Sequence, residues 1–168
     1  NKQAQLAYNR AFRDALQSGA ILRQKLDDVL RDQEIWDDKK EERYNSILKT
    51  LQDNEKSIKA GGIKLSDAKD LADEMSTSRN EFRSLISERT SMDSNTAEGQ
   101  ADNARFNFLV YACTKDTKNQ SIFSDVEDYE DNSIEPFALE AARQLAEKLY
   151  GLDADYENTL PENEFLKD

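Results

Sequence analysis

Apolar and small residues recur at helical spacing through the first part of the chain. Between about Lys2 and Gln33 they alternate in steps of four and three, at Tyr8, Phe12, Ala15, Gly19, Leu22, Leu26 and Val29. Charged side chains occupy the opposite face, as in an amphipathic helix that packs along one stripe. This heptad pattern predicts a single helix of about 30 residues.

A second helix is predicted from about Asp38 to Lys59. Its apolar positions follow the same spacing, at Tyr44, Ile47, Leu48, Leu51 and Ile58. Asp38 and Glu41 stand three residues apart, as in a capping box, and the preceding Ile35 and Trp36 can fold over the first helical turn. The alternative is that the chain runs straight through Trp36, which would fuse both segments into one helix of about 60 residues.

Two adjacent glycines, Gly61 and Gly62, follow the second helix. Glycine adopts left-handed backbone conformations without steric cost, so the pair is expected to end that helix and reverse the chain. A third helix is expected to begin at the N-cap Ser66, with apolar positions at Ala68, Leu71, Met75, Phe82, Leu85 and Met92. So short a connection predicts two antiparallel neighbouring helices. A phosphate-binding glycine loop is excluded, because no strand precedes the glycines and no Gly-Lys-Ser/Thr follows them.

A fourth helix is predicted soon after Met92. Asn95 and Glu98 again have capping-box spacing, which predicts a helix from about Thr96 to Ala112. The apolar stretch FNFLVYAC within it is also compatible with a strand. No partner strand is apparent, so a buried helix end is the preferred interpretation.

Three shorter helical segments are predicted from Ser124 onward. Ser124 to Glu127 has the form of a capping box at the start of a short helix. Pro136 begins the next helix and Gly151 ends it. The apolar stripe of that helix consists of Phe137, Ala141, Leu145 and Leu149. Pro161 is expected to start a last helical turn.

The predicted fold is all-α and has two regions. Residues 1–92 form a long antiparallel helical hairpin or coiled coil, and residues 93–168 form a smaller acidic helical region. Only 37% of the residues are hydrophobic, which suits long helices that bury a narrow stripe. The seam residues are expected to hold this fold together and to form its interfaces: Phe12, Leu22, Leu26, Leu51, Leu71, Phe82 and Leu85.

The net charge of −12 is confined to the second region. Residues 1–92 contain 17 Lys and Arg against 17 Asp and Glu, whereas residues 93–168 contain 6 against 18. An acidic surface repels nucleic acid and anionic membranes, so neither is expected as a partner. No apolar stretch is long enough for a membrane span, and no signal peptide is visible. The acidic region serves solubility or, alternatively, offers a surface to a basic partner or a cation.

The chain lacks histidine and has one cysteine, Cys113. Without histidine, Ser-His-Asp and Cys-His arrangements and most transition-metal sites are excluded, and no carboxylate pair stands out. Cys113 lies in an apolar stretch and is expected to be a buried thiol in a reducing, cytoplasmic compartment. We therefore expect a protein without enzymatic activity and without a bound cofactor.

One acidic stretch has part of the spacing of a calcium-binding loop. Positions 1, 3, 5, 7 and 12 of such a loop would be Asp153, Asp155, Glu157, Thr159 and Glu164. Against this interpretation, Asn158 replaces the glycine needed at the sixth position and Pro161 occupies the ninth. The alternative for this candidate metal site is a solvated acidic loop ahead of a short helix.

Three stretches resemble a family of proteins from marine, contractile-tailed bacteriophages: IWDDKKEERY, NTAEGQADNARFNFLVYAC and LYGLDADYENTLPENEFLKD. No activity or set of functional residues comes with this resemblance. It implies a phage protein without enzymatic chemistry, either a virion component or a tail-assembly factor, in the host cytoplasm or the virion. In that family the sequence continues beyond the last residue of this chain, and both ends are expected to be cuts through a longer protein.

The sequence favours a non-enzymatic structural or assembly protein that acts through helical interfaces, by self-association or by docking a partner helix. One alternative is a chaperone-like module whose acidic half shields a basic or aggregation-prone partner. Another is a calcium-responsive regulator, which a calorimetric titration with calcium would test.

Overall fold

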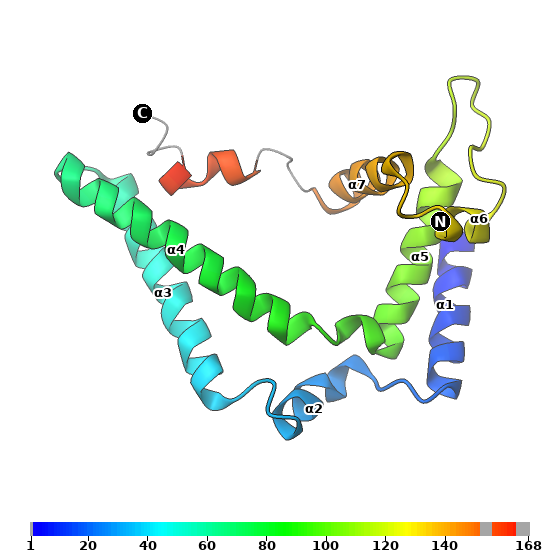
Figure 1. Cartoon of the computed structure of the whole chain (residues 1–168), viewed down its shortest axis with the longest axis horizontal. Coiled ribbons are helices and arrows are strands. Elements are labelled where there is room, and N and C mark those ends of the chain that lie inside the picture. The colour runs from blue at the N-terminus through cyan, green and yellow to red at the C-terminus, as the bar shows by residue number, and fades with distance from the viewer. Residues whose placement is uncertain (1, 152–155, 164–168) are drawn as a thin grey trace. The chain divides into compact units, whose positions relative to one another are not determined.

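The computed structural model describes residues 2–151 and 156–163. Within these residues the protein is all-α (Figure 1), as the sequence predicts, and the only β-type pairing is an isolated bridge between Lys115 and Ser121. The elements in chain order are α1 (Lys2–Gln17), η1 (Arg23–Lys25), α2 (Leu26–Asp32), α3 (Asp38–Ala60), α4 (Leu65–Thr90), η2 (Asp93–Asn95), α5 (Ala97–Cys113), α6 (Val126–Asp131), α7 (Pro136–Tyr150) and η3 (Tyr156–Thr159).

Contacts group the described residues into two units. Unit 1 contains residues 2–26 and 92–151, and unit 2 contains residues 27–91 and 156–163. The charge pattern divides the chain near Met92, and one boundary between the units falls there. The structure differs in placing the first 26 residues with the acidic stretch, so each unit is built from two separate parts of the chain.

Unit 2 is built on a helical hairpin of α3 and α4, which run side by side (Figure 1). Gly61 and Gly62 have φ angles of 70° and 78°, so the predicted reversal through left-handed glycines is confirmed. Ser66 is not the N-cap: α4 begins one residue before it, after Lys64, whose side chain makes no capping hydrogen bond. The buried seam of the hairpin consists of Ile47 and Leu51 from α3 and Ala68, Ala72, Met75 and Leu85 from α4.

The prediction of one helix from Lys2 to Gln33 is wrong. Gly19 takes a φ of 91° just after α1 ends, and its N–H donates to the Leu16 carbonyl at 3.2 Å. The N–H of Ala20 donates to the Ala15 carbonyl at 2.9 Å. This pair of bonds satisfies the last carbonyls of α1 in a left-handed C-terminal cap. The heptad pattern treats Gly19 as a seam position, but this glycine ends the helix.

The chain also breaks at Trp36, between α2 and α3, so the prediction of a second helix from Asp38 to Lys59 is confirmed to within a residue. Its cap is Asp37, not Asp38: the Asp37 side chain accepts a hydrogen bond from the N–H of Lys40 at 2.8 Å. The carboxylate of Glu41 accepts from the Trp36 indole N–H at 2.7 Å, and the Trp36 ring packs edge-on against Tyr44. Trp36 therefore does fold over the first turns of α3.

Unit 1 is organised around α5, which packs along α1 and also contacts α6 and α7 (Figure 1). The stretch FNFLVYAC is helical, as preferred from the sequence. Buried alanines on both α1 and α5, among them Ala4, Ala15 and Ala101, present little side-chain bulk where these helices pack. A second cluster of buried side chains joins the end of α5 to α6 and α7: Val110, Phe123, Tyr129 and Ala138.

The short helices of unit 1 begin and end close to where the sequence places them. α6 is capped by Asp125, one residue after the predicted Ser124, through a hydrogen bond from the N–H of Asp128. α7 starts at Pro136 and ends at Gly151, which has a left-handed conformation. In unit 2, residues 161–163 form the predicted last helical turn.

Candidate functional site

α7 has a broad apolar face, of which only one part is covered. Ala138 is buried, and Ala141, Ala142 and Leu145 pack against the cluster shared with α5 and α6. A second set adjoins the covered residues on one flank of the helix, at spacings of seven and four: Leu139, Ala146 and Tyr150. Leu139 is 56% exposed and Tyr150 66%. We call this set the α7 outer stripe.

The α7 outer stripe runs into a surface groove. Leu149 and Tyr150 form one wall, and Phe106 and Leu109 of α5 form the other. The groove has a volume of about 340 Å³, and Asp102 and Arg105 contribute to its lining. A groove of mixed polar and apolar lining that continues an exposed apolar stripe is typical of protein–protein docking surfaces.

α6 and the turn that leads into α7 carry uncompensated negative charge. No Lys or Arg occurs between Lys118 and Arg143. Within this stretch the carboxylates of Glu127, Asp131 and Glu135 are exposed, and the described residues include no ion pair for them. Ile134, in the turn between α6 and α7, is 81% exposed in the middle of these acids. We call Glu127, Asp131 and Glu135 the acidic end of the stripe.

Arg143 does not neutralise the acidic end. Its guanidinium is bonded to Glu140, one turn earlier on α7, and to Glu147, one turn later. Hydrogen bonds to Glu140 from Arg143 first, and from Gln144 second, lower the pKa of this carboxyl to about 2. Glu140 is therefore charged throughout the physiological range, and Arg143 is already engaged.

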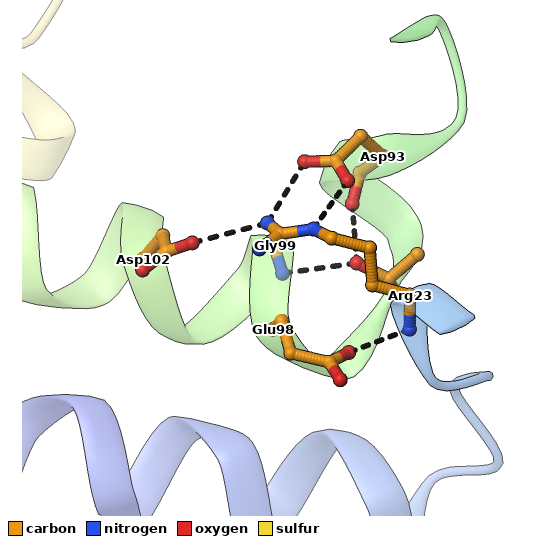
Figure 2. A network of polar contacts seen from close by, with 6 residues as sticks. Arg23, Asp93, Glu98, Gly99 and Asp102 are labelled. Carbon is orange, nitrogen blue, oxygen red and sulfur yellow. Dashed lines mark hydrogen bonds and ion pairs between the residues drawn. The ribbon is translucent and has the colours of Figure 1, made fainter. Parts of the chain in front are cut away.

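A polar junction joins η1, which follows α1, to η2 and the start of α5 (Figure 2). The Arg23 guanidinium donates to Asp93 at 2.6 and 3.0 Å and to Asp102 at 3.0 Å. These hydrogen bonds, with Asp93 contributing most, raise the pKa of Arg23. The backbone N–H of Arg23 also donates to Glu98 at 2.8 Å. The carboxylates around Arg23 are thus all used to hold the two segments together.

The N-terminus of α5 completes this junction. Thr96 caps the helix: its hydroxyl accepts from the N–H of Gly99 at 3.0 Å and donates to the Asp93 carbonyl at 2.6 Å. The N–H of Ala97 donates to the carbonyl of Ile21 at 2.9 Å. Gly99 lies directly beneath the Asp93 backbone, where a Cβ atom would stand 2.0 Å from the carbonyl oxygen. The junction is a structural device rather than a ligand site.

Unit 2 contains an aromatic cluster at the open end of the hairpin. Trp36 is 2% exposed, and Tyr44 stacks on Phe82 with ring centroids 4.9 Å apart. The guanidinium of Arg89 lies 5.3 Å from the Trp36 ring centroid and 5.9 Å from that of Tyr44. Cation–π contacts of this kind add to the burial of the rings. The cluster fixes the entry of α3 against the end of α4.

The segment 156–163 is fastened to α4 within unit 2. Glu162 is 1% exposed and forms an ion pair with Arg79, and Leu160 is buried. Burial is the largest single influence and lowers the Arg79 pKa, but the hydrogen bond to Glu162 and the nearby negative charges together leave this pKa raised. A second, exposed pair joins Arg83 to Glu157 at 2.8 Å.

Arg79→Met is expected to release this segment. An unpaired buried carboxylate at Glu162 costs about 3–5 kcal/mol, which exceeds the roughly 2 kcal/mol that burial of Leu160 contributes. The amides of Leu160 and Asn163 should then exchange with solvent about tenfold faster or more, measured by hydrogen exchange. Arg83→Met is the matched control and should change these rates little, because exposed pairs contribute about 1 kcal/mol or less. Equal rates in both variants would contradict this account.

The structure divides the predicted seam residues between the two units. Leu51, Leu71, Phe82 and Leu85 lie in the α3–α4 hairpin, whereas Phe12, Leu22 and Leu26 belong to unit 1. Leu26, Leu51 and Leu85 are buried. The others are half-buried: Phe12, Leu22, Leu71 and Phe82. The predicted seam residues are therefore shared between two units, and each part stabilises its own unit.

The α7 outer stripe was not found from the sequence. The stripe predicted for this helix contains Ala141 and Leu145, which do pack inward, and Phe137 and Leu149, which are about half exposed. The signal for a second face was the recurrence of Leu139, Ala146 and Tyr150 at steps of seven and four.

The candidate calcium site falls mostly outside the described residues, which exclude Asp153, Asp155 and Glu164. Of the two described positions, Glu157 pairs with Arg83, and the Thr159 hydroxyl donates to the Tyr156 carbonyl. Across residues 2–151 and 156–163, no group of three or more potential metal ligands comes together. Calcium binding stays a prediction.

The expectation of a buried thiol is wrong. Cys113 is exposed, because it is the last residue of α5 and lies beyond Val110, the residue of that turn that enters the core. It lines a shallow surface depression with Phe137 and Lys148.

Together these features define an all-α protein with an uncovered apolar helix face. Among the described residues, none of the helices combines the length and apolar character that a membrane span requires. No protein-family model, curated protein or solved structure matches the chain.

Proposed function

We propose that this is a non-enzymatic structural or assembly protein that acts through helical protein–protein interfaces, with the α7 outer stripe as its docking face. The observation that carries the proposal is the exposure of Leu139 and Tyr150 on one flank of a helix whose neighbouring apolar residues are already packed. Exposed apolar surface arranged along a helix is costly to keep in water and is typical of binding faces.

The absence of histidine supports a role without catalysis, because the commonest general acid and base is missing from the chain. The resemblance to proteins of contractile-tailed phages supports a place in a virion or in tail assembly, in the host cytoplasm. The acidic surface favours a protein partner over nucleic acid.

The double variant Leu139→Ser/Tyr150→Ser tests the docking face. We expect its affinity for itself or for a captured partner to fall about tenfold or more, because each truncated anchor removes over about 1 kcal/mol. Sedimentation velocity and stoichiometric pull-down of the full chain measure this loss. The matched control is Ile63→Ser/Leu65→Ser at the hairpin tip, which should associate like the unchanged protein. Equal behaviour of both variants would overturn the proposed docking face.

A second candidate function is a chaperone-like module, favoured by the base-free acidic stretch between Lys118 and Arg143. The stoichiometry of the captured complex separates the two candidates. A structural component remains in a permanent complex at a fixed ratio, whereas a chaperone-like module is recovered with its partner in a soluble, substoichiometric complex.

A further inference from the structure

We propose that the α7 outer stripe binds a basic amphipathic helix of a partner protein. The apolar face of that helix lies along the stripe, and its Lys and Arg residues lie against Glu127, Asp131 and Glu135. This inference rests on the proposed function and names the partner class for the same docking face.

The spacing of the stripe residues favours a helical partner. Leu139, Ala146 and Tyr150 recur at steps of seven and four, which is the spacing that a second helix matches along a common seam. Leu139 and Tyr150 present bulky exposed side chains, and the smaller Ala146 lies between them along the helix. An extended strand would meet side chains at every second residue and could not follow this spacing.

The negative charge near the stripe favours a basic partner. The acidic end has three exposed carboxylates without an ion pair among the described residues, and Arg143 is held by Glu140 and Glu147. Partner Lys or Arg residues placed there relieve mutual repulsion and accelerate association. A second copy of this chain would bring another net charge of −12 to the same surface, which disfavours self-association as the occupant.

The two ends of the stripe also determine the orientation of the partner helix. The groove lined by Phe106, Leu109, Leu149 and Tyr150 accepts a large apolar side chain. Glu135 of the acidic end precedes α7 and lies at the other end of this helix, about 22 Å away for fifteen helical residues. A partner helix of about 15 residues, with an apolar anchor at one end and basic residues at the other, fits this arrangement.

The test measures peptide binding to the full chain by fluorescence anisotropy at about 150 mM salt. The probe is a labelled Lys/Leu peptide of about 18 residues with leucines at heptad positions. A Glu/Leu peptide of the same pattern and a Lys/Leu peptide with the same composition in scrambled order are the reference probes. We expect the amphipathic Lys/Leu peptide to bind at least about tenfold more tightly than either reference.

Two variants locate the binding. Glu127→Gln/Asp131→Asn/Glu135→Gln removes the charge of the acidic end, and Leu139→Ser/Tyr150→Ser removes the apolar anchors. Each should weaken peptide binding about tenfold. The matched charge control, Asp53→Asn/Asp70→Asn/Asp73→Asn, removes three exposed carboxylates from the hairpin, and with Ile63→Ser/Leu65→Ser it should leave binding within about twofold. Equal losses in the charge variant and its control would show general attraction and overturn the inference.

The same experiment separates this inference from the proposed function. Equal binding of the three peptides, with self-association that disappears in Leu139→Ser/Tyr150→Ser, would overturn the basic partner and leave the docking face standing. Equal peptide binding, with no effect of the stripe variant on any association, would overturn both.

Discussion

Gly99→Ala is expected to lower the free energy of unfolding by about 3 kcal/mol. Inside an ordinary helix the same change raises stability by up to about 1 kcal/mol, because alanine has the higher helix propensity. The sign reverses here because the new Cβ would stand 2.0 Å from the carbonyl oxygen of Asp93 and 2.8 Å from its carbon. Both are backbone atoms, so no side-chain rotation relieves the clash.

The displacement of η2 would also weaken the contacts that hold the junction together. Thr96 bonds both Asp93 and Gly99, and Asp93 bonds Arg23, so a shift of Asp93 affects the cap and the ion pair together. Urea unfolding followed by circular dichroism measures the change. Asn103→Ala, at an exposed site of the same helix, is the control and should be neutral or slightly stabilising. A gain of stability in Gly99→Ala would show that Gly99 does not pack closely against the Asp93 backbone.

Trp36→Ala is expected to cost about 3–5 kcal/mol of unfolding free energy. The indole is almost fully buried, packs on Tyr44, lies under the Arg89 guanidinium and donates to Glu41. Removing it opens a cavity where α3 enters the hairpin, and the side chains around it can close that space only in part.

Trp36→Phe separates packing from the hydrogen bond. It keeps most of the apolar contact but leaves Glu41 without the indole donor, so it should cost less than the alanine variant. Because Trp36 is the only tryptophan, unfolding must be followed by circular dichroism rather than intrinsic tryptophan fluorescence. A loss below about 1 kcal/mol in Trp36→Ala would contradict the role of Trp36 as the anchor of unit 2.

Local signals predicted the hairpin well. The two adjacent glycines and the flanking apolar stripes lie within one continuous stretch, so spacing and turn chemistry were sufficient to identify α3, α4 and their reversal. The helix ends at Pro136 and Gly151 were likewise fixed by the residues themselves. The caps were displaced by one residue at Asp37, Thr96 and Asp125, because several neighbouring polar residues can each serve as a cap. At α4 the cap is Lys64, two residues before the predicted Ser66, and its side chain makes no capping hydrogen bond.

Non-local pairings could not be predicted in the same way. The heptad spacing continues through Gly19, so the sequence predicts an unbroken helix there. In the structure Gly19 ends α1, and this helix packs on α5. The candidate docking face was missed for a related reason. Which of two apolar stripes on α7 faces the core depends on the position of Phe123 and Tyr129, which only the fold defines.

The interleaved order of the two units has a consequence for how the chain folds as it is synthesised. α1 leaves the ribosome before residues 27–91, and its partner α5 begins only at Ala97. At roughly 5–20 residues per second, α1 would wait about 5–20 s without its packing partner. A 16-residue helix is marginal in water by itself, whereas the hairpin of α3 and α4 has only local contacts to make. The inserted hairpin should therefore fold first, and the unit that brackets it should close last.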